Sequence, residues 1–146
     1  MMIAEASTEV AAPLERLRAV VLDPASYAAA DTKVIAIHIE EQTAAGMVAR
    51  IDGHLGPFRS WIRVRYVLSP RRVDLIMLQG RLRGFHACFL FEPLNGKVRL
   101  THREEYDFGY GPLTRLVEFA LHRWAVGTVR AEVEALRRAA ESGPER

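Results

Sequence analysis

Hydrophobic and polar residues alternate through most of the stretch from residue 33 to residue 108, which is the pattern of strands that bury one face. Six strands are predicted in it, at residues 33–41, 46–55, 59–68, 73–79, 85–93 and 97–108. The connections between them are short, and most contain Gly or Pro, as turns do. Consecutive strands with short connections predict an antiparallel meander, in which each strand pairs with the next.

The chain before this stretch predicts one more strand and two short helices. Residues 3–10 alternate small or apolar with polar residues, as a strand does. Pro13 suits the first turn of a helix, and an apolar stripe continues after it. Asp23 precedes a proline and is typical of the N-cap of a second helix, over residues 24–30.

Residues 113–141 predict one long helix, which only Gly127 interrupts. This helix is the only predicted element large enough to cover a face of the sheet. The sequence therefore predicts an α+β fold in a single domain over residues 1–141, followed by a disordered tail at 142–146.

The pair Asn95-Gly96 is the strongest short hairpin signal in the chain and fixes the register of the last two strands. If these two residues form the loop, Leu94 pairs with Lys97 and the two strand faces differ sharply in character. One face carries the pairs Phe91 with Leu100, Phe89 with His102, Ala87 with Glu104, and Phe85 with Tyr106. The other carries Glu92 with Arg99 and His86 with Glu105, which suits a face in water.

His102 and Glu104 thus lie on a face that three phenylalanines require to be covered. A buried carboxylate costs several kcal/mol unless it is paired or protonated, so Glu104 needs a partner. One interpretation is an internal His–Glu pair without a function. The other is a polar anchor for a ligand in an apolar cavity, and both interpretations stay open.

The neighbouring strands add further candidates to the covered face. A loop centred on Leu82 places Met77 and Gln79 there, and the strand before adds Tyr66. On the long helix, Trp124 is the aromatic residue that suits the core. The candidate ligand-binding residues are His102, Glu104, Tyr106, Tyr66, Gln79, Phe85, Phe89, Met77 and Trp124.

Composition narrows the classes of function. A sequence pI near 9.0 is typical of proteins that bind nucleic acid. Here, however, 18 acidic residues are interspersed with 20 basic ones, so we expect no nucleic-acid binding. Cys88 is the only cysteine, which excludes an internal disulfide and a cysteine-built zinc site. We expect no metal and no cofactor. No apolar run is long enough for a membrane span and no signal peptide is visible, so a cytoplasmic location is expected.

Both ends of the chain resemble the helix-grip superfamily of START-like proteins, polyketide cyclases/dehydratases and birch-pollen-allergen relatives. The family's opening strand, Ala-Pro helix start and Asp-x-x-x-Tyr second helix resemble residues 10–27, "VAAPLERLRAVVLDPASY". Its closing helix resembles residues 111–141, "GPLTRLVEFALHRWAVGTVRAEVEALRRAAE". In relatives the positions that match His102 and Glu104 are commonly apolar, and this sequence departs from them there.

The resemblance implies a curved seven-stranded antiparallel sheet wrapped around the long helix. It also implies a cavity between them for an apolar or amphipathic, lipid- or polyketide-like molecule. A second hypothesis is an enzyme of the cyclase/dehydratase kind, with His102 or Glu104 as acid–base group and Tyr66 or Tyr106 as proton donor. A third is a protein-interaction module.

Two further features are ambiguous. The surplus of apolar residues on the long helix suggests a homodimer. Arg81 and Arg83, in the loop between two strands, have the chemistry to recognise a carboxylate or phosphate at a cavity mouth. A solvated turn is the simpler explanation of these arginines and is preferred.

Overall fold

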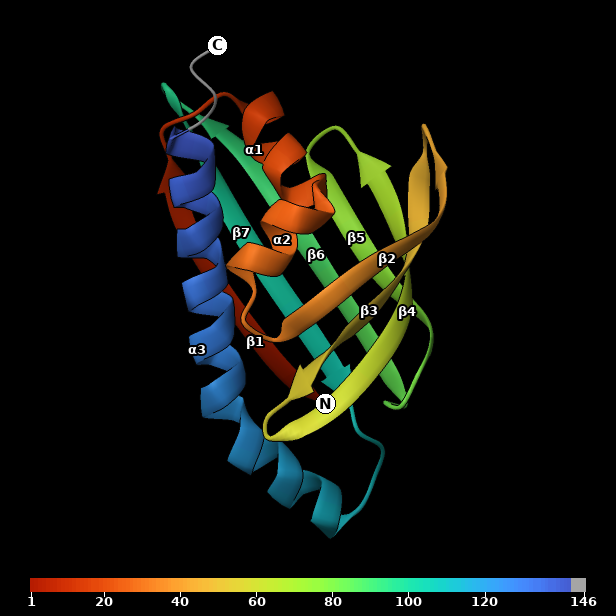
Figure 1. Ribbon diagram of the computed structural model, residues 1–146. Coiled ribbons are helices and arrows are strands. Elements are labelled where there is room, and N and C mark those ends of the chain that lie inside the picture. Colours follow the sequence, from red (N-terminus) through yellow and green to blue (C-terminus); the bar gives the residue numbers. More distant parts are fainter. Residues whose placement is uncertain (143–146) are drawn as a thin grey trace.

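The computed structural model describes residues 1–142 of the chain. In this part the strands and helices follow one another in the predicted order (Figure 1). Their bounds are β1 Met2–Val10, α1 Leu14–Leu22, α2 Pro24–Ala30, β2 Val34–Thr43, β3 Gly46–Leu55, β4 Phe58–Ser69, β5 Arg72–Gly80, β6 Gly84–Leu94, β7 Lys97–Asp107 and α3 Pro112–Ser142. The predicted tail begins inside α3, at Ser142, and its other residues lie outside the described part.

The strands form one antiparallel sheet of seven strands in the order β1-β7-β6-β5-β4-β3-β2. Strands β2 to β7 pair with successive neighbours, which confirms the predicted meander, and β1 pairs with the last strand. Figure 1 shows that the sheet curves strongly and that α3 runs along β1, with α1 and α2 beside it. This is the helix-grip fold that the resemblance implied.

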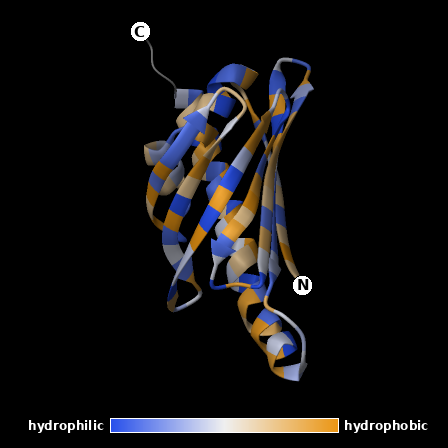
Figure 2. Cartoon of the chain, turned by 90° about the vertical axis from the view of Figure 1, so that its right-hand side faces the viewer, coloured by the Kyte–Doolittle hydropathy of each residue, from blue (hydrophilic) through white to orange (hydrophobic). Residues whose placement is uncertain are grey.

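The β6–β7 hairpin has the register that Asn95-Gly96 predicted. Leu94 pairs with Lys97, and the pairing continues in step to Gly84 and Asp107. The phenylalanine face is covered and the opposite face carries its ion pairs, Arg99 with Glu92 at 3.2 Å and His86 with Glu105 at 3.9 Å. Figure 2 shows the resulting alternation of hydrophobic and hydrophilic residues along the strands.

The β5 strand departs from prediction in two ways. Ile76 pairs with His86, so the β5–β6 loop is centred on residue 81, one residue before Leu82. Each β5 residue therefore lies opposite a β6 residue two positions away from the predicted one. Because the shift is an even number, the same β5 side chains still face the covered side of the sheet. A β-bulge in the pairing with β4 then inserts Leu78 as an extra residue, and Gln79 lies opposite Arg63 on the outer face. Gln79 is exposed, so its placement on the covered face is wrong.

Capping and turn contacts position the segment between α2 and β2. The Asp23 side chain accepts a hydrogen bond from the Ser26 N–H at 3.0 Å and so begins α2, as predicted. The Asp31 N–H donates to the Tyr27 carbonyl and ends this helix. The Asp31 carboxylate then accepts from the Lys33 N–H at 2.9 Å, which turns the Lys33 side chain towards the interior.

The two halves of α3 have different surroundings. Its C-terminal half is packed on the sheet through Val129, Val133 and Leu136, while its first turns project beyond the strands (Figure 1). Leu113 and Phe119 in these turns are 72% and 83% exposed. The homodimer stays a prediction. None of the helices within residues 1–142 has an apolar stretch of the length that a membrane crossing requires.

Candidate functional site

A cavity of about 90 Å³ opens between the strands of the curved sheet and α2. Its walls are mainly apolar, from residues of β2 to β6 and their loops, and its inner end is polar. The lining residues are Tyr27, Asp31, Lys33, Val34, Ile51, Gly53, His54, Leu55, Ser60, Trp61, Ile62, Leu75, Met77, Arg81, Leu82, Phe85, Glu104 and Tyr106. The described part of α3 supplies no lining residue, so the expected position between sheet and long helix is wrong.

The polar end of the cavity is the accessible side of a cluster of five buried ionisable residues. Asp31 and Lys33 come from the α2–β2 connection, His102 and Glu104 from β7, and Glu132 from α3. The cluster separates α3 from the cavity, because Lys33 and Glu104 line it whereas Glu132 does not. We call these five residues the charged cluster.

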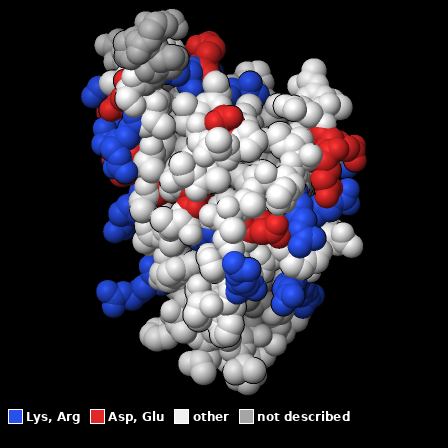
Figure 3. Space-filling model, viewed as in Figure 1, with Lys and Arg blue, Asp and Glu red and all other residues white. Residues whose placement is uncertain are grey.

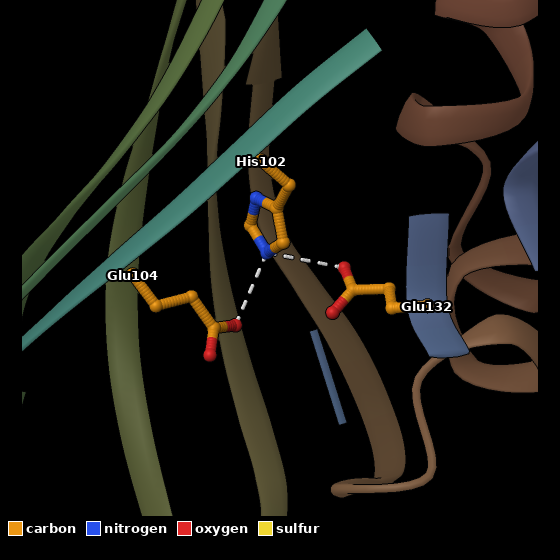
Figure 4. A group of neighbouring side chains, drawn as sticks. All are labelled: His102, Glu104 and Glu132. Carbon is orange, nitrogen blue, oxygen red and sulfur yellow. Dashed lines mark hydrogen bonds and ion pairs between the residues drawn. The ribbon is translucent and has the colours of Figure 1, made fainter. Parts of the chain in front are cut away.

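His102 is held by both of its ring nitrogens. Nδ1 lies 2.9 Å from the backbone carbonyl oxygen of Cys88, which can only accept, so Nδ1 carries a proton. Nε2 lies 3.1 Å from Oε2 of Glu104 and 3.2 Å from Oε2 of Glu132 (Figure 4). Because both nitrogens face acceptors, the ring is a doubly protonated imidazolium. Phe89 stacks on it, with ring centroids 3.9 Å apart.

Charge explains why this buried ring keeps its proton. Burial alone disfavours the cation and lowers the pKa of His102, but the Glu132 and Glu104 carboxylates outweigh this effect. The pKa of His102 is therefore well above its ordinary value of 6.5. At neutral pH the imidazolium is a fixed cation and has no lone pair with which to accept a proton.

Glu104 is the best-connected carboxylate of the charged cluster. The Tyr106 hydroxyl donates to its Oε1 at 2.6 Å, and its Oε2 lies 3.1 Å from His102 and 3.4 Å from the Lys33 ammonium. Burial works to raise the pKa of Glu104, but Lys33 and His102 together lower it to about 2. Glu104 is thus ionised at neutral pH.

Asp31 is the carboxyl group that keeps a proton near neutral pH. The Lys33 ammonium lies 2.9 Å from its Oδ1, which favours the carboxylate. Burial and the negative charge of Glu132 oppose this and raise the pKa of Asp31 to about 8. With Asp31 neutral, two cations, Lys33 and His102, face two carboxylates, Glu104 and Glu132, and the charged cluster carries no net charge.

Glu132 is fully buried, and neither of its oxygens accepts a hydrogen bond in good geometry within the described residues. It is neutralised by charge instead, with His102 at 3.2 Å and Lys33 at 3.5 Å. The ligand atoms of His102, Glu104 and Glu132 lie within 4.8 Å of one another, a spacing that suits a metal ion. Lys33 and His102 together already neutralise the two carboxylates, so the charge of the cluster calls for no metal.

The structure brings together only part of the predicted site. Met77, Phe85, Glu104 and Tyr106 line the cavity. Three candidates are buried behind its wall rather than in it: His102, Phe89 and Tyr66. Trp124 packs against a second hydrophobic cluster, which includes Met2, Ala125 and Val129, and is not part of the wall.

Sequence reasoning missed Asp31, Lys33 and Glu132. A signal for Glu132 was available, because it lies within the stripe of Val129, Val133 and Leu136 that the helical repeat places on the buried side. Lys33 gave no such signal, since it is the first residue of a predicted strand, where a lysine is ordinarily exposed.

Comparison with known proteins shows a family and a fold. The family model described as polyketide cyclase / dehydrase and lipid transport matches residues 1–141. No curated protein matches the chain. Among solved structures, the Zhui aromatase/cyclase of Streptomyces sp. R1128 is similar over 95% of this chain and 93% of its own, with 17% identity and a TM-score of 0.79.

Two further structures share the fold. A protein of Thermus thermophilus has a TM-score of 0.82 at 13% identity, with 93% of this chain and 94% of its own covered. A START superfamily protein of Mycobacterium smegmatis has a TM-score of 0.73 at 15% identity, with 97% and 99% covered. At these identities the likeness shows the fold alone.

Two carboxyl-to-amide substitutions should differ sharply at pH 6 to 7. Glu104→Gln leaves the buried cations in excess and should lower the free energy of unfolding by about 3–5 kcal/mol. Asp31→Asn removes the cost of keeping a carboxyl group protonated above its ordinary pKa of 3.8, so this variant should be at least as stable as the wild type. Urea unfolding monitored by circular dichroism measures both. Equal losses in the two variants would contradict the assigned charges, and Glu105→Gln on the outer face is the control for Glu104.

Stability should fall as the pH rises from 6 to 9. The folded chain keeps protons that the unfolded chain releases, on Asp31 between its ordinary pKa of 3.8 and about 8, and on His102 above 6.5. Each such proton contributes a slope of up to about 1.4 kcal/mol per pH unit. The Asp31→Asn variant should lose the Asp31 contribution below pH 8. Denaturant unfolding at several pH values gives the slopes, and identical slopes for variant and wild type would refute the shift on Asp31.

Proposed function

Because the chain belongs to the polyketide cyclase/dehydrase and lipid transport family, we propose that it binds an apolar or amphipathic small molecule in the cavity beside the charged cluster. The family model covers residues 1–141, but the family name includes both enzymes and lipid carriers. The choice between them therefore depends on the site itself.

The observation that carries the proposal is the contrast between the walls and the inner end of the cavity. Apolar side chains such as Ile51, Leu75 and Met77 line much of it, and buried ionised groups meet at its inner end, where Lys33 lies 3.4 Å from Glu104. This combination is typical of small-molecule sites, in which apolar walls supply affinity and a few polar groups set orientation. Fixed partners on Glu104 keep the polar end rigid.

Cyclase/dehydratase chemistry with His102 and Glu104 as acid–base groups has less support. His102 is fully buried and does not line the cavity, and the pKa of Glu104 lies far below neutral. One observation favours a different enzyme hypothesis: Asp31 lines the cavity, and a pKa of about 8 suits a group that donates a proton near pH 7. Asp31 is therefore the acid of the second candidate function.

The third hypothesis, a protein-interaction module, would draw on the exposed start of α3, where Leu113, Leu116 and Phe119 face solvent. It names no partner and explains no feature of the charged cluster. The cytoplasmic location stays a prediction from the sequence.

A substitution that fills the cavity should weaken binding. Met77→Trp places a larger side chain in the cavity wall and should weaken the binding of the neutral probe N-phenyl-1-naphthylamine at least about tenfold, or 1.4 kcal/mol. Ile76→Trp is the matched control, because the neighbouring side chain faces outward and is 43% exposed. Fluorescence titration gives both affinities.

Native mass spectrometry of freshly purified protein should also detect a co-purified small molecule in the wild type and less of it in Met77→Trp. Equal probe binding by wild type, Met77→Trp and Ile76→Trp would place the ligand elsewhere and would refute the proposal.

A further inference from the structure

The end of the molecule at which α3 begins exposes a concentration of apolar surface. Five large hydrophobic side chains there are 63% to 85% exposed, whereas the other exposed ones of residues 2–142 reach at most 45%. Because the first turns of α3 project beyond the strands, three of the five stand out from the body of the protein (Figure 1). The five are Phe58, Tyr110, Leu113, Leu116 and Phe119.

Antiparallel pairing brings these residues to one end of the sheet. Strands β3, β5 and β7 run towards it, so the turn after β3, the loop after β5 and the start of α3 meet there. A Cβ atom at Gly56 would lie 2.6 Å from the Leu121 side chain, and the Arg83 guanidinium lies 4.2 Å from the ring centroid of Tyr110. Both connections therefore touch the segment around the start of α3. We call residues 56–59, 81–83 and 107–123 the apolar end.

The cavity reaches the apolar end. Leu55, at the end of β3, and Leu82, in the β5–β6 loop, line the cavity and are half-buried. Both residues pack against the second hydrophobic cluster, as Leu121 of α3 does. The side of the cavity away from the charged cluster is thus formed by the same connections that adjoin the exposed start of α3.

Positive charge accompanies this apolar surface. The apolar end carries five arginines and two acidic residues. Of the two, Asp107 lies 3.7 Å from Arg83, and the side chain of Glu118 is only 18% exposed. Figure 3 shows that the lower end of this face of the molecule carries no acidic side chain and is bordered by basic ones. A partner with exposed negative charge is complementary to it.

The first turns of α3 combine both properties on their exposed side. Leu113, Leu116 and Ala120 recur at the spacing of one helical face, and all three are exposed. Arg115 and Arg123, in the same turns, are exposed as well. Arginine side chains keep their charge at the level of lipid headgroups while apolar neighbours reach deeper, so this segment suits the surface of a bilayer.

A second copy of the chain fits the apolar end less well. A two-fold axis through this end would bring the five arginines of one copy close to the five of the other. Like charges that face each other oppose association. A projecting apolar tip on a protein partner would also need a matching pocket, whereas a bilayer deforms around it.

We propose that the apolar end docks on a lipid bilayer with anionic headgroups, with Leu113, Leu116 and Phe119 inserted among the lipids and the arginines against the phosphates. Docking in this way turns the adjoining side of the cavity towards the membrane, from which an apolar ligand could be taken up. The docking surface goes beyond the proposed function, and only its use for ligand uptake rests on that function.

Sedimentation with lipid vesicles tests the docking surface. The wild type should bind vesicles of equal parts phosphatidylglycerol and phosphatidylcholine at least about tenfold more tightly than vesicles of phosphatidylcholine alone, and added salt should weaken this binding. Leu116→Gln/Phe119→Gln should lower the affinity for the mixed vesicles at least about tenfold. Ile76→Gln/Leu78→Gln is the matched control, because these two side chains of β5 are 43% and 40% exposed, and it should bind as the wild type does.

The arginines have a matched control on the same helix. Arg115→Gln/Arg123→Gln should lower the affinity for the mixed vesicles about tenfold. Arg130→Gln/Arg138→Gln removes the same charge from exposed positions in later turns of α3 and should change the affinity less than about twofold.

The other outcomes overturn the inference. Absence of wild-type binding to the mixed vesicles at low salt refutes it, and so do equal losses in Leu116→Gln/Phe119→Gln and its control. Equal binding to both kinds of vesicle, or equal losses in the two arginine variants, refutes the anionic surface as the partner. If the wild type ignores vesicles but forms a dimer in light scattering that Leu116→Gln/Phe119→Gln abolishes, this end is a contact between two copies.

The probe N-phenyl-1-naphthylamine, titrated without vesicles, separates this inference from the proposed function. Leu116→Gln/Phe119→Gln should bind the probe as the wild type does, and Met77→Trp should bind the mixed vesicles as the wild type does. Vesicle binding by a wild type that does not bind the probe would refute the cavity function and leave the docking surface standing.

Discussion

The burial of five ionisable groups at one point is the constraint on which the site depends. An isolated charge there would cost several kcal/mol, so each member of the charged cluster is tolerable only with the others in place. His102 and Glu104 on β7, Glu132 on α3 and Lys33 beside α2 come from elements that are distant in sequence. Their charges cancel only when α3 and α2 are docked on the sheet. The cluster therefore couples the packing of the helices to the shape of the cavity.

This arrangement explains how the proposed binding site can lie beside so many charges. The His102 imidazolium and the Glu132 carboxylate form the hidden half of the cluster, and they fix Lys33 and Glu104, which form the half that lines the cavity. A polar end that is fixed and balanced orients a ligand without competing for it as a counterion.

The sequence predicted the elements, the meander and the β6–β7 register well, because alternation and a two-residue turn specify them locally. It also placed His102 and Glu104 on the covered face. It could not place Gln79, since a bulge at Leu78 depends on how β4 and β5 curve together. Nor could it supply Lys33 as the partner of Glu104, because that ion pair joins residues 71 positions apart and forms only when the α2–β2 turn meets β7. Local pattern thus revealed the carboxylate that needed a partner, and only the tertiary structure identified the partner.

The protonation of His102 is the most direct test of this account, because the balance of the charged cluster requires a permanent imidazolium. Nitrogen-15 NMR of the labelled protein reports the charge and the tautomer of the ring at each pH. The account predicts that both ring nitrogens of His102 keep the chemical shifts of an imidazolium from pH 5 to above pH 8. A neutral His102 ring at pH 7 would contradict it.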